Sequence, residues 1–269
     1  MSFRHVKSSL LVLALMGGAL MSGAAWAGRD CEQRAPTVQA VTQGLALAER
    51  VQRQLDRSGA EVVVLARMGQ DLNRHGLRYS HLGLAYRHEG VWRVLHKLNA
   101  CGSDRAAVFR EGLGQFFLDD PHEYEAALVP LNRSVASSIQ PLLASPQVLR
   151  PLHEPRYSML SYAWAQHYQQ SNQWAIEVLA FAQQRAVAPQ AVARRTSAQQ
   201  WLKQAGYQPA EIRLSAWTRL GARLTAANVA FDDHPLAWRA SGRFQTVTVE
   251  SVLGWLQASG LGGPLIVVR

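Results

Sequence analysis

Two histidines in the first half of the chain are of a type and spacing that could perform general-base chemistry. His81 opens an apolar segment, and His96 lies on a second apolar segment that follows a His-Glu-Gly turn at residues 88–90. Histidine accepts a proton near neutral pH, and a second polar side chain can hold its ring in one orientation. Two interpretations are open: a base with its orienting partner, or two polar residues tolerated at the margin of a sheet.

The length of the turn decides whether the two rings can meet. If Glu89 and Gly90 form a two-residue hairpin turn, His96 faces Gly83 and lies diagonal to His81 on the same face of the ladder. A three-residue turn shifts the alternation by one position and separates them. The sequence therefore predicts a shared proton network on condition of the shorter turn.

A nucleophile for such a base could come from the polar segment Ser171-Asn172-Gln173-Trp174, which precedes an apolar helix. A serine at a helix N-terminus gains from the positive end of the helix dipole and from unpaired backbone N–H groups that can hold an oxyanion. Ser171 with a histidine base would give acyl-transfer chemistry, and the three residues after it would bind substrate. The alternative is that Ser171 only caps the helix.

Cys31 and Cys101 are the only cysteines of the chain. In an exported protein two cysteines usually form one disulfide, and we expect that pairing here. It would tie the segment before the first helix to the end of the second hairpin strand. The alternative is a nucleophilic Cys101, which would leave Cys31 as an odd thiol.

The turn Asp232-Asp233-His234-Pro235 contains oxygen and nitrogen groups that could bind a metal. Adjacent residues seldom all point at one ion, and the proline marks a turn. We therefore expect a solvated turn with local capping, and neither a metal site nor another cofactor.

Residues 1–27 have the pattern of a secretory signal peptide. A basic start is followed by an apolar run over residues 10–20 and by the small-x-small sequence at residues 25–27. The apolar run is shorter than a membrane span requires. We expect a protein located in the periplasm or secreted, with no membrane span, and a single domain over residues 28–269.

The formal net charge is +9, and nearly all of the basic residues are arginine. The arginines are scattered, and no aromatic-interleaved basic stripe or known nucleic-acid module is present, so a nucleic-acid partner is not expected. Attraction to anionic envelope surfaces is one interpretation of the charge, and a compositional bias of the genome is the other. The oligomeric state does not follow from the sequence.

The periodicity of apolar residues predicts how these groups are positioned. Helices are expected at 37–55, 104–117, 132–143, 171–185, 197–205 and 250–258, and strands at 61–68, 82–87, 91–98, 123–129 and 244–249, with a strand-like tail at 264–269. Sequential hairpins mixed with helices indicate the α+β class, an antiparallel sheet packed with helices.

Four segments together resemble an exported proteobacterial family, the domain of unknown function 2145. They are HKLNACG at 96–102, EGLGQFFLDD at 111–120, SNQWAIEVLA at 171–180, and DDHP at 232–235 with the following TVTVESVLGW. More distantly, SHLGLAY, the returning strand and the later helix start resemble the circularly permuted papain-like hydrolases of the NlpC/P60 class.

The second resemblance implies a permuted papain-like fold with His81 as general base. His96 would orient it, with Asn99 as the runner-up, and the nucleophile position falls at or near Ser171. Hydrolases of this class use cysteine at that position, and this chain has serine there. A hydroxyl has a far higher pKa than a thiol and depends more on its base. Either Ser171 is a serine nucleophile, or the fold is kept without the chemistry.

Two functions are therefore expected from the sequence. The first is an envelope hydrolase or acyltransferase that acts on amide or ester bonds through Ser171, His81 and His96. The second is a non-catalytic periplasmic binding or assembly factor that uses the same cleft. In both cases the partner would be a cell-envelope component, namely peptidoglycan, a peptide or a lipid.

Overall fold

The computed structural model describes residues 35–118 and 121–269, with the side chains of residues 223–225 excepted. The predicted signal peptide and Cys31 lie outside the described residues.

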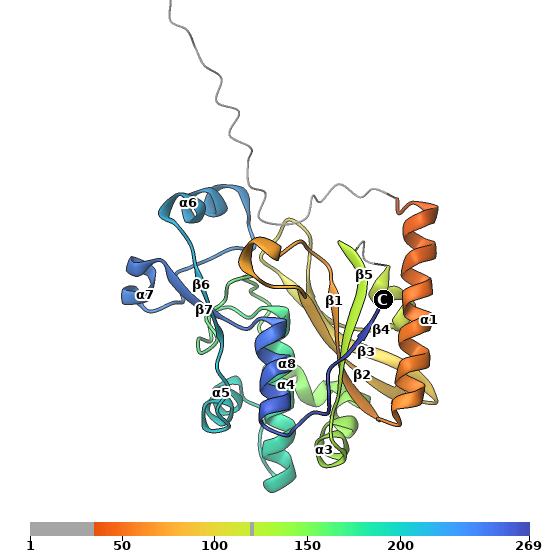
Figure 1. Cartoon of the computed structure of the whole chain (residues 1–269). Coiled ribbons are helices and arrows are strands. Elements are labelled where there is room, and N and C mark those ends of the chain that lie inside the picture. Colours follow the sequence, from red (N-terminus) through yellow and green to blue (C-terminus); the bar gives the residue numbers. More distant parts are fainter. Residues whose placement is uncertain (1–34, 119–120) are drawn as a thin grey trace, which may run out of the picture.

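An antiparallel sheet of six strands forms the centre of the fold, in the order β4-β3-β2-β1-β5-β8 (Figure 1). The strands are β1 (Val62–Met68), β2 (His81–His88), β3 (Val91–Asn99), β4 (Ala106–Gly112), β5 (Glu123–Pro130) and β8 (Ile266–Val268). Together with the helices around it, the sheet confirms the predicted α+β class.

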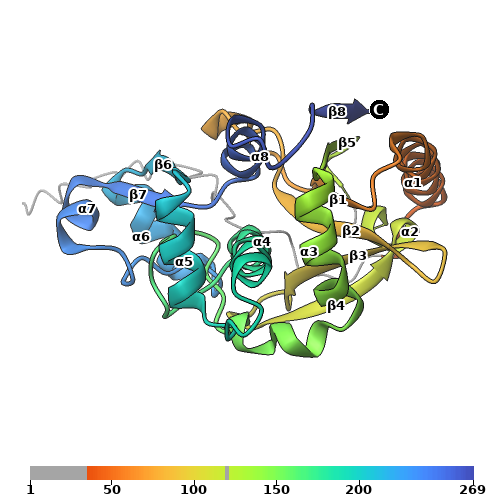
Figure 2. The ribbon, with the colours of Figure 1, turned by 90° about the horizontal axis from the view of Figure 1, so that it is seen from below.

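Helices cover both faces of this sheet. The helices of this part of the fold are α1 (Val38–Ser58), α2 (Leu113–Phe117), α3 (Arg133–Ala144), α4 (Ser171–Val187), α5 (Arg195–Gln204), which packs on α4, and α8 (Val249–Ala258), with 3₁₀ turns η1 (Asn73–His75) and η2 (Pro146–Leu152). Figure 2 shows α1 and α2 on one side of the sheet and α3 and α4 on the other. Within the described residues, no helix has the length and apolar character that crossing a bilayer requires.

The two layers bury two separate cores because successive residues of a strand point to opposite faces. All seven residues of β1 are buried. Val63 and Leu65 pack with residues of α1 and α2. Val62 and Val64 pack with residues of α3, α4 and α8. The face that each β2 or β3 side chain occupies therefore determines which helices it can meet.

The predicted hairpin is confirmed, including its two-residue turn. Glu89 and Gly90 have φ angles of 51° and 79°, as expected for the turn type that matches the twist of the strands. His88 pairs with Val91, and the ladder continues through Leu84 and Leu95. This register places His81 and His96 on the same face.

The helix predicted over residues 104–117 is wrong for most of its length. Residues 106–112 form β4, which pairs with β3 along its whole length, and only residues 113–117 are helical. Tertiary pairing with the otherwise open edge of β3 outweighs the local helix signal. This change brings Glu111 onto the sheet, next to the histidines.

A small lobe lies beside the sheet and was mostly missed by the sequence reading. It contains β6 (Ala210–Arg213), α6 (Ala216–Thr225), α7 (Leu236–Ser241) and β7 (Arg243–Thr246). β6 and β7 form a two-stranded antiparallel ribbon. The strand predicted at 244–249 is shorter than expected, because Thr248 caps α8 through its side chain.

Candidate functional site

His81 and His96 are in direct contact. Nε2 of His81 lies 2.9 Å from Nδ1 of His96, and Nε2 of His96 lies 2.9 Å from Oε2 of Glu111. His96 is fully buried and His81 nearly so. The three side chains form one chain of hydrogen bonds that runs from the edge strand β4 across β3 to the start of β2.

The ring of Phe116, in α2, packs against both imidazoles. Its centroid lies 5.8 Å from that of His81 and 5.2 Å from that of His96. Arg67, which pairs with His81 across the β1–β2 ladder, places its guanidinium 4.8 Å from the same ring and donates a hydrogen bond to the Phe116 carbonyl. The two imidazoles are therefore fixed on the face of the sheet that α1 and α2 cover.

A cleft of about 960 Å³ opens where β2 begins and β3 ends. His81 lines it, together with Tyr157, Ser171 and residues of η1 and α6. Its apolar wall comes from the segment before α4 and from the small lobe: Met159, Leu160, Ile212, Leu214, Val229 and Phe231. The cleft thus places a buried histidine chain in contact with a mixed polar and apolar surface.

Ser171 also lines the cleft, but its helix α4 packs on the face of the sheet opposite to that of His81. Ser171 is the first residue of α4, and the N-cap of that helix is Gln170, so Ser171 is not the N-cap. Leu82, the neighbour of His81, packs in the α4 core and donates its N–H to Asn172 Oδ1 at 3.1 Å. His81, one residue earlier, faces α2 instead.

Ser171 and Tyr157 line the cleft together, and Ser171 lies close enough to affect the pKa of the Tyr157 hydroxyl. Burial raises the pKa of the Tyr157 hydroxyl, and Ser171 partly offsets that rise. Tyr157 is thus a neutral neighbour of the predicted nucleophile at physiological pH.

The predicted binding residues at the start of α4 hold the fold together. Asn172 bridges β2 and the segment before α8, since its Nδ2 also donates to the Val247 carbonyl at 3.3 Å. Gln173 accepts from Ser161 and donates to the carbonyls of residues 162 and 163. Trp174 is buried in the α4 core. Of this group Ser171 and Asn172 line the cleft.

Asn99, the alternative orienting residue, ends β3 and lines the cleft. Its side chain donates a long hydrogen bond of 3.4 Å to the Ala100 carbonyl. The sequence left open whether His96 or Asn99 orients His81, and it is His96 that contacts the His81 ring.

Cys101 also lines the cleft, close to Asn99. No cysteine among the described residues is a free thiol, so Cys101 is not available as a nucleophile. Its predicted partner Cys31 lies outside the described residues, and their disulfide stays a prediction.

A buried ionic cluster fixes the segment that leads into α4. Lys97, on the face of β3 opposite to His96, donates to the carbonyls of Glu154 and Gln169 and to the Gln169 side chain. Glu177 pairs with Arg195 at 2.8 Å, with both side chains buried. Burial, reinforced by the charge of Arg195, lowers the pKa of Lys97 to about 7. These contacts position residues 169–171 at the rim of the cleft.

The Asp232-Asp233-His234 turn is not the solvated turn that the sequence indicates. Asp232 is exposed, but the side chains of Asp233 and His234 are completely buried. His234 contacts Asp233 Oδ1 and the Gln245 carbonyl, both at 3.0 Å, so the pair anchors β7. In the described part of the chain, no cluster of three histidine, cysteine or acidic residues could hold a metal ion.

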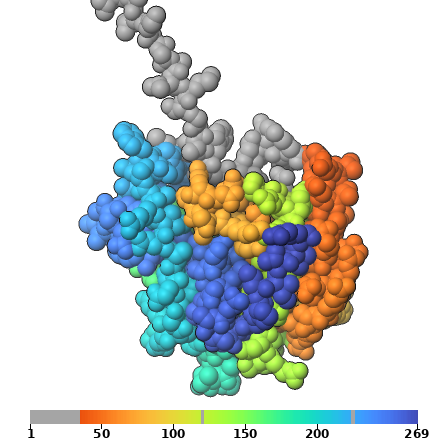
Figure 3. Space-filling view, in the orientation of Figure 1, coloured from red at the N-terminus to blue at the C-terminus, as the bar shows by residue number. Residues whose placement is uncertain are grey.

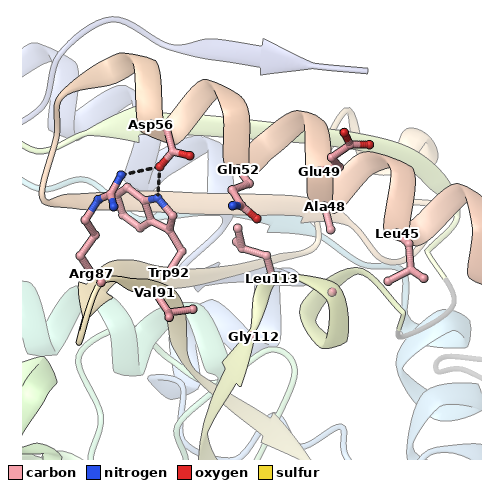
Figure 4. Close-up of a pocket in the computed structure, with 12 residues that line it drawn as sticks. Leu45, Ala48, Glu49, Gln52, Asp56, Arg87, Val91, Trp92, Gly112 and Leu113 are labelled. Atoms are coloured by element: carbon pink, nitrogen blue, oxygen red, sulfur yellow. Dashed lines mark hydrogen bonds and ion pairs between the residues drawn. The ribbon is translucent and has the colours of Figure 1, made fainter.

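A second hollow, of about 480 Å³, lies between α1 and the β2–β3 turn (Figure 4). Asp56 of α1 accepts hydrogen bonds there from Arg87 and, at 2.8 Å, from Trp92 Nε1. These charged and polar groups satisfy one another across the helix–hairpin contact. The hollow therefore has the character of a structural junction, and the larger cleft is the stronger candidate site.

Glu111 is the member of the site that sequence reasoning missed. On the expected helix it would have pointed to solvent with no specific partner. The run Val108-Phe109-Arg110 ending at Gly112 carried the missing signal, since aromatic and β-branched residues before a glycine favour a strand.

The chain belongs to the bacterial family described as uncharacterized protein conserved in bacteria, DUF2145, whose model matches residues 54–256. The match covers both histidine strands, Glu111 and the start of α4. Neither the curated proteins nor the solved structures gave a match.

Proposed function

We propose that this protein is an exported cell-envelope hydrolase or acyltransferase in which His81 is the general base. The observation that carries the proposal is the hydrogen-bonded chain Glu111–His96–His81, which begins on the edge strand β4 and ends at a cleft. A base held in place by a buried orienting group, itself oriented by a third group, is the arrangement that general-base catalysis needs. The predicted leader supports an envelope location.

Proton placement along the chain follows from its carboxylate end. An ionised Glu111 can only accept, so Nε2 of His96 carries the proton of that bond. Nδ1 of a neutral His96 then accepts from Nε2–H of His81. In this assignment Nδ1 is the proton-accepting nitrogen of His81.

The group that His81 deprotonates is either Ser171 or a water molecule or substrate hydroxyl in the cleft. Ser171 has the helix N-terminus in its favour, with its unpaired N–H groups. The opposite faces of the sheet on which α4 and His81 lie favour the second choice.

The experiment is hydrolysis of a panel of p-nitrophenyl esters and peptidoglycan fragments, combined with labelling by a fluorophosphonate probe. We expect His81→Ala to lower turnover by about 100-fold or more. Loss of labelling in both Ser171→Ala and His81→Ala would identify Ser171 as the nucleophile. Turnover that survives Ser171→Ala would indicate activated water. Ser137→Ala, an exposed serine of α3, is the matched control.

A non-catalytic binding factor is the second candidate, and one observation favours it. The polar side chains at the start of α4 serve internal hydrogen bonds, as Asn172 and Gln173 do. On this reading the protein binds envelope fragments, detected as a change in tryptophan fluorescence, without turning them over. Full turnover in His81→Ala would exclude the enzymatic proposal.

A further inference from the structure

The outward face of α6 has the wrong polarity for an ordinary surface helix. Trp217 and Leu220 are 82% and 50% exposed, and helical spacing puts them on one face with Gly221. A helix on a soluble surface normally turns its polar side to water. Here the apolar side is exposed, at the edge of the small lobe.

The opposite face of α6 forms part of the cleft. Thr218 and Ala222 line the cleft, and Ala222 packs in a small cluster with Val229 and Phe244. The inward side is therefore already occupied. Trp217 and Leu220 thus do not belong to the packed cluster of the lobe and form a separate, outward surface.

Exposed basic groups lie on β6, which leads into α6, and on η1. Arg213 of β6 has a side chain that is 81% exposed and lies 3.3 Å from Glu211. Arg219 of α6 points to the inner side instead, where it donates to the carbonyl of Arg239 and lies over the ring of Phe244. Across the cleft, η1 carries the exposed Arg74. Figures 1 and 3 show α6 and η1 at the same end of the molecule. The formal net charge of the chain is +9.

We propose that α6 docks the protein onto an anionic phospholipid surface. Trp217 and Leu220 enter the headgroup region, where tryptophan is favoured, and the exposed Arg74 and Arg213 meet lipid phosphates. Charge complementarity and the tryptophan select a bilayer over a second copy of this basic chain. The docking would hold the mouth of the cleft next to the membrane, and it does not depend on whether His81 is catalytic.

The test is flotation with vesicles of phosphatidylcholine, with and without phosphatidylglycerol. Protein from full-length expression is used, so that all variants share the same N-terminal processing. We expect wild type to float with the anionic vesicles and the double variant Trp217→Ser, Leu220→Ser to bind at least about tenfold more weakly. Val187→Ser, an 89% exposed valine at the end of α4, is the matched control and should bind as wild type does.

Circular dichroism checks that the double variant is folded. The milder variant Trp217→Phe gives a second measurement that does not depend on the double variant. The fluorescence of wild type minus that of Trp217→Phe is the emission of Trp217, and this emission should shift to shorter wavelength with anionic vesicles. Wild type that does not bind, or a folded double variant that binds equally well, would overturn the proposal. So would a wild-type dimer that the double variant converts to monomer, because this face would then join two copies. His81→Ala should bind vesicles normally, which separates this result from the enzymatic proposal.

Discussion

Glu111 accepts a hydrogen bond of 2.9 Å from Nε2 of His96, across the two strands at the edge of the sheet. His96 is fully buried, and the Glu111 side chain is only 11% exposed. A carboxylate in this position fixes both the tautomer and the orientation of the ring that contacts His81.

Replacing Glu111 by glutamine should therefore impair catalysis without removing the base. The amide oxygen can still accept from His96, but the amide can also rotate and donate, which reverses the order of protons along the chain. We expect a fall in kcat of about tenfold with KM nearly unchanged, which is smaller than the loss in His81→Ala. Steady-state kinetics of the two variants provides the measurement. Equal losses in both variants, or a change confined to KM, would contradict a positioning role for Glu111.

The sequence placed His81 and His96 together on condition of a two-residue turn at Glu89-Gly90, and the structure has that turn. No local sequence signal determines which helix packs against the histidines. That depends on how β1, β2 and β3 assemble between two helical layers, which is a tertiary property. For this reason the resemblance to permuted hydrolases paired His81 with Ser171, while the fold puts α2 directly against the histidine.

Residues 104–117 and the small lobe show a second limit of sequence reasoning. β4 exists because β3 offers it an open edge, and the short strands β6 and β7 depend on each other. Such pairing energy comes from residues distant in the chain and is invisible in a local window. The buried Asp233–His234 pair is a similar case, since a polar turn sequence gives no indication that β7 will cover it.

Gly83 is required for the histidine pair to fit. A Cβ at this position would lie 2.5 Å from Cγ1 of Val94 and 3.1 Å from Cβ of His96. Because Val94 is branched and buried, neither neighbour can move away easily. We expect Gly83→Ala to destabilise the protein by about 1–3 kcal/mol and to lower the activity through displacement of His96. Urea denaturation measures the first effect.

Gly254→Ala is the matched control for that substitution. Gly254 lies inside α8, and a Cβ there would meet nothing within 4 Å. This variant should be stabilised by about 0.5–1 kcal/mol through its helix propensity. Equal stability of the two variants would mean that the space beside His96 is not restricted.

Lys97 should make stability rise with pH. Its pKa is about 7 in the folded protein against its ordinary value of 10.5, so between these limits the unfolded chain binds one more proton than the folded one. Stability then increases with pH by at most about 1.4 kcal/mol per unit, and the contribution is constant below pH 7. Lys97→Met should lack this rise. Urea denaturation at pH 7, 8 and 9 compares the two proteins.

The exposed lysine of α5 provides the control for that comparison. Lys203→Met makes the same chemical change outside the buried cluster, and it should keep the pH dependence of wild type. If wild type and Lys97→Met gave parallel curves from pH 7 to 9, the buried amine would not be the source of the effect.

The Asp233–His234 pair should be among the most sensitive polar contacts of the small lobe. The His234 ring has a partner at each nitrogen, the Asp233 carboxyl group at Nδ1 and the Gln245 carbonyl at Nε2, both at 3.0 Å. Asp233 Oδ2 also accepts from the Tyr162 N–H at 2.8 Å. Asp233→Ala leaves a buried ring nitrogen of His234 and the Tyr162 N–H without their partner and should cost about 1–3 kcal/mol. Asp232→Ala, its exposed neighbour, should change stability by less than about 0.5 kcal/mol. Thermal and urea unfolding measure the stability of the two variants. Similar losses of stability in Asp233→Ala and Asp232→Ala would contradict a structural role for the buried pair.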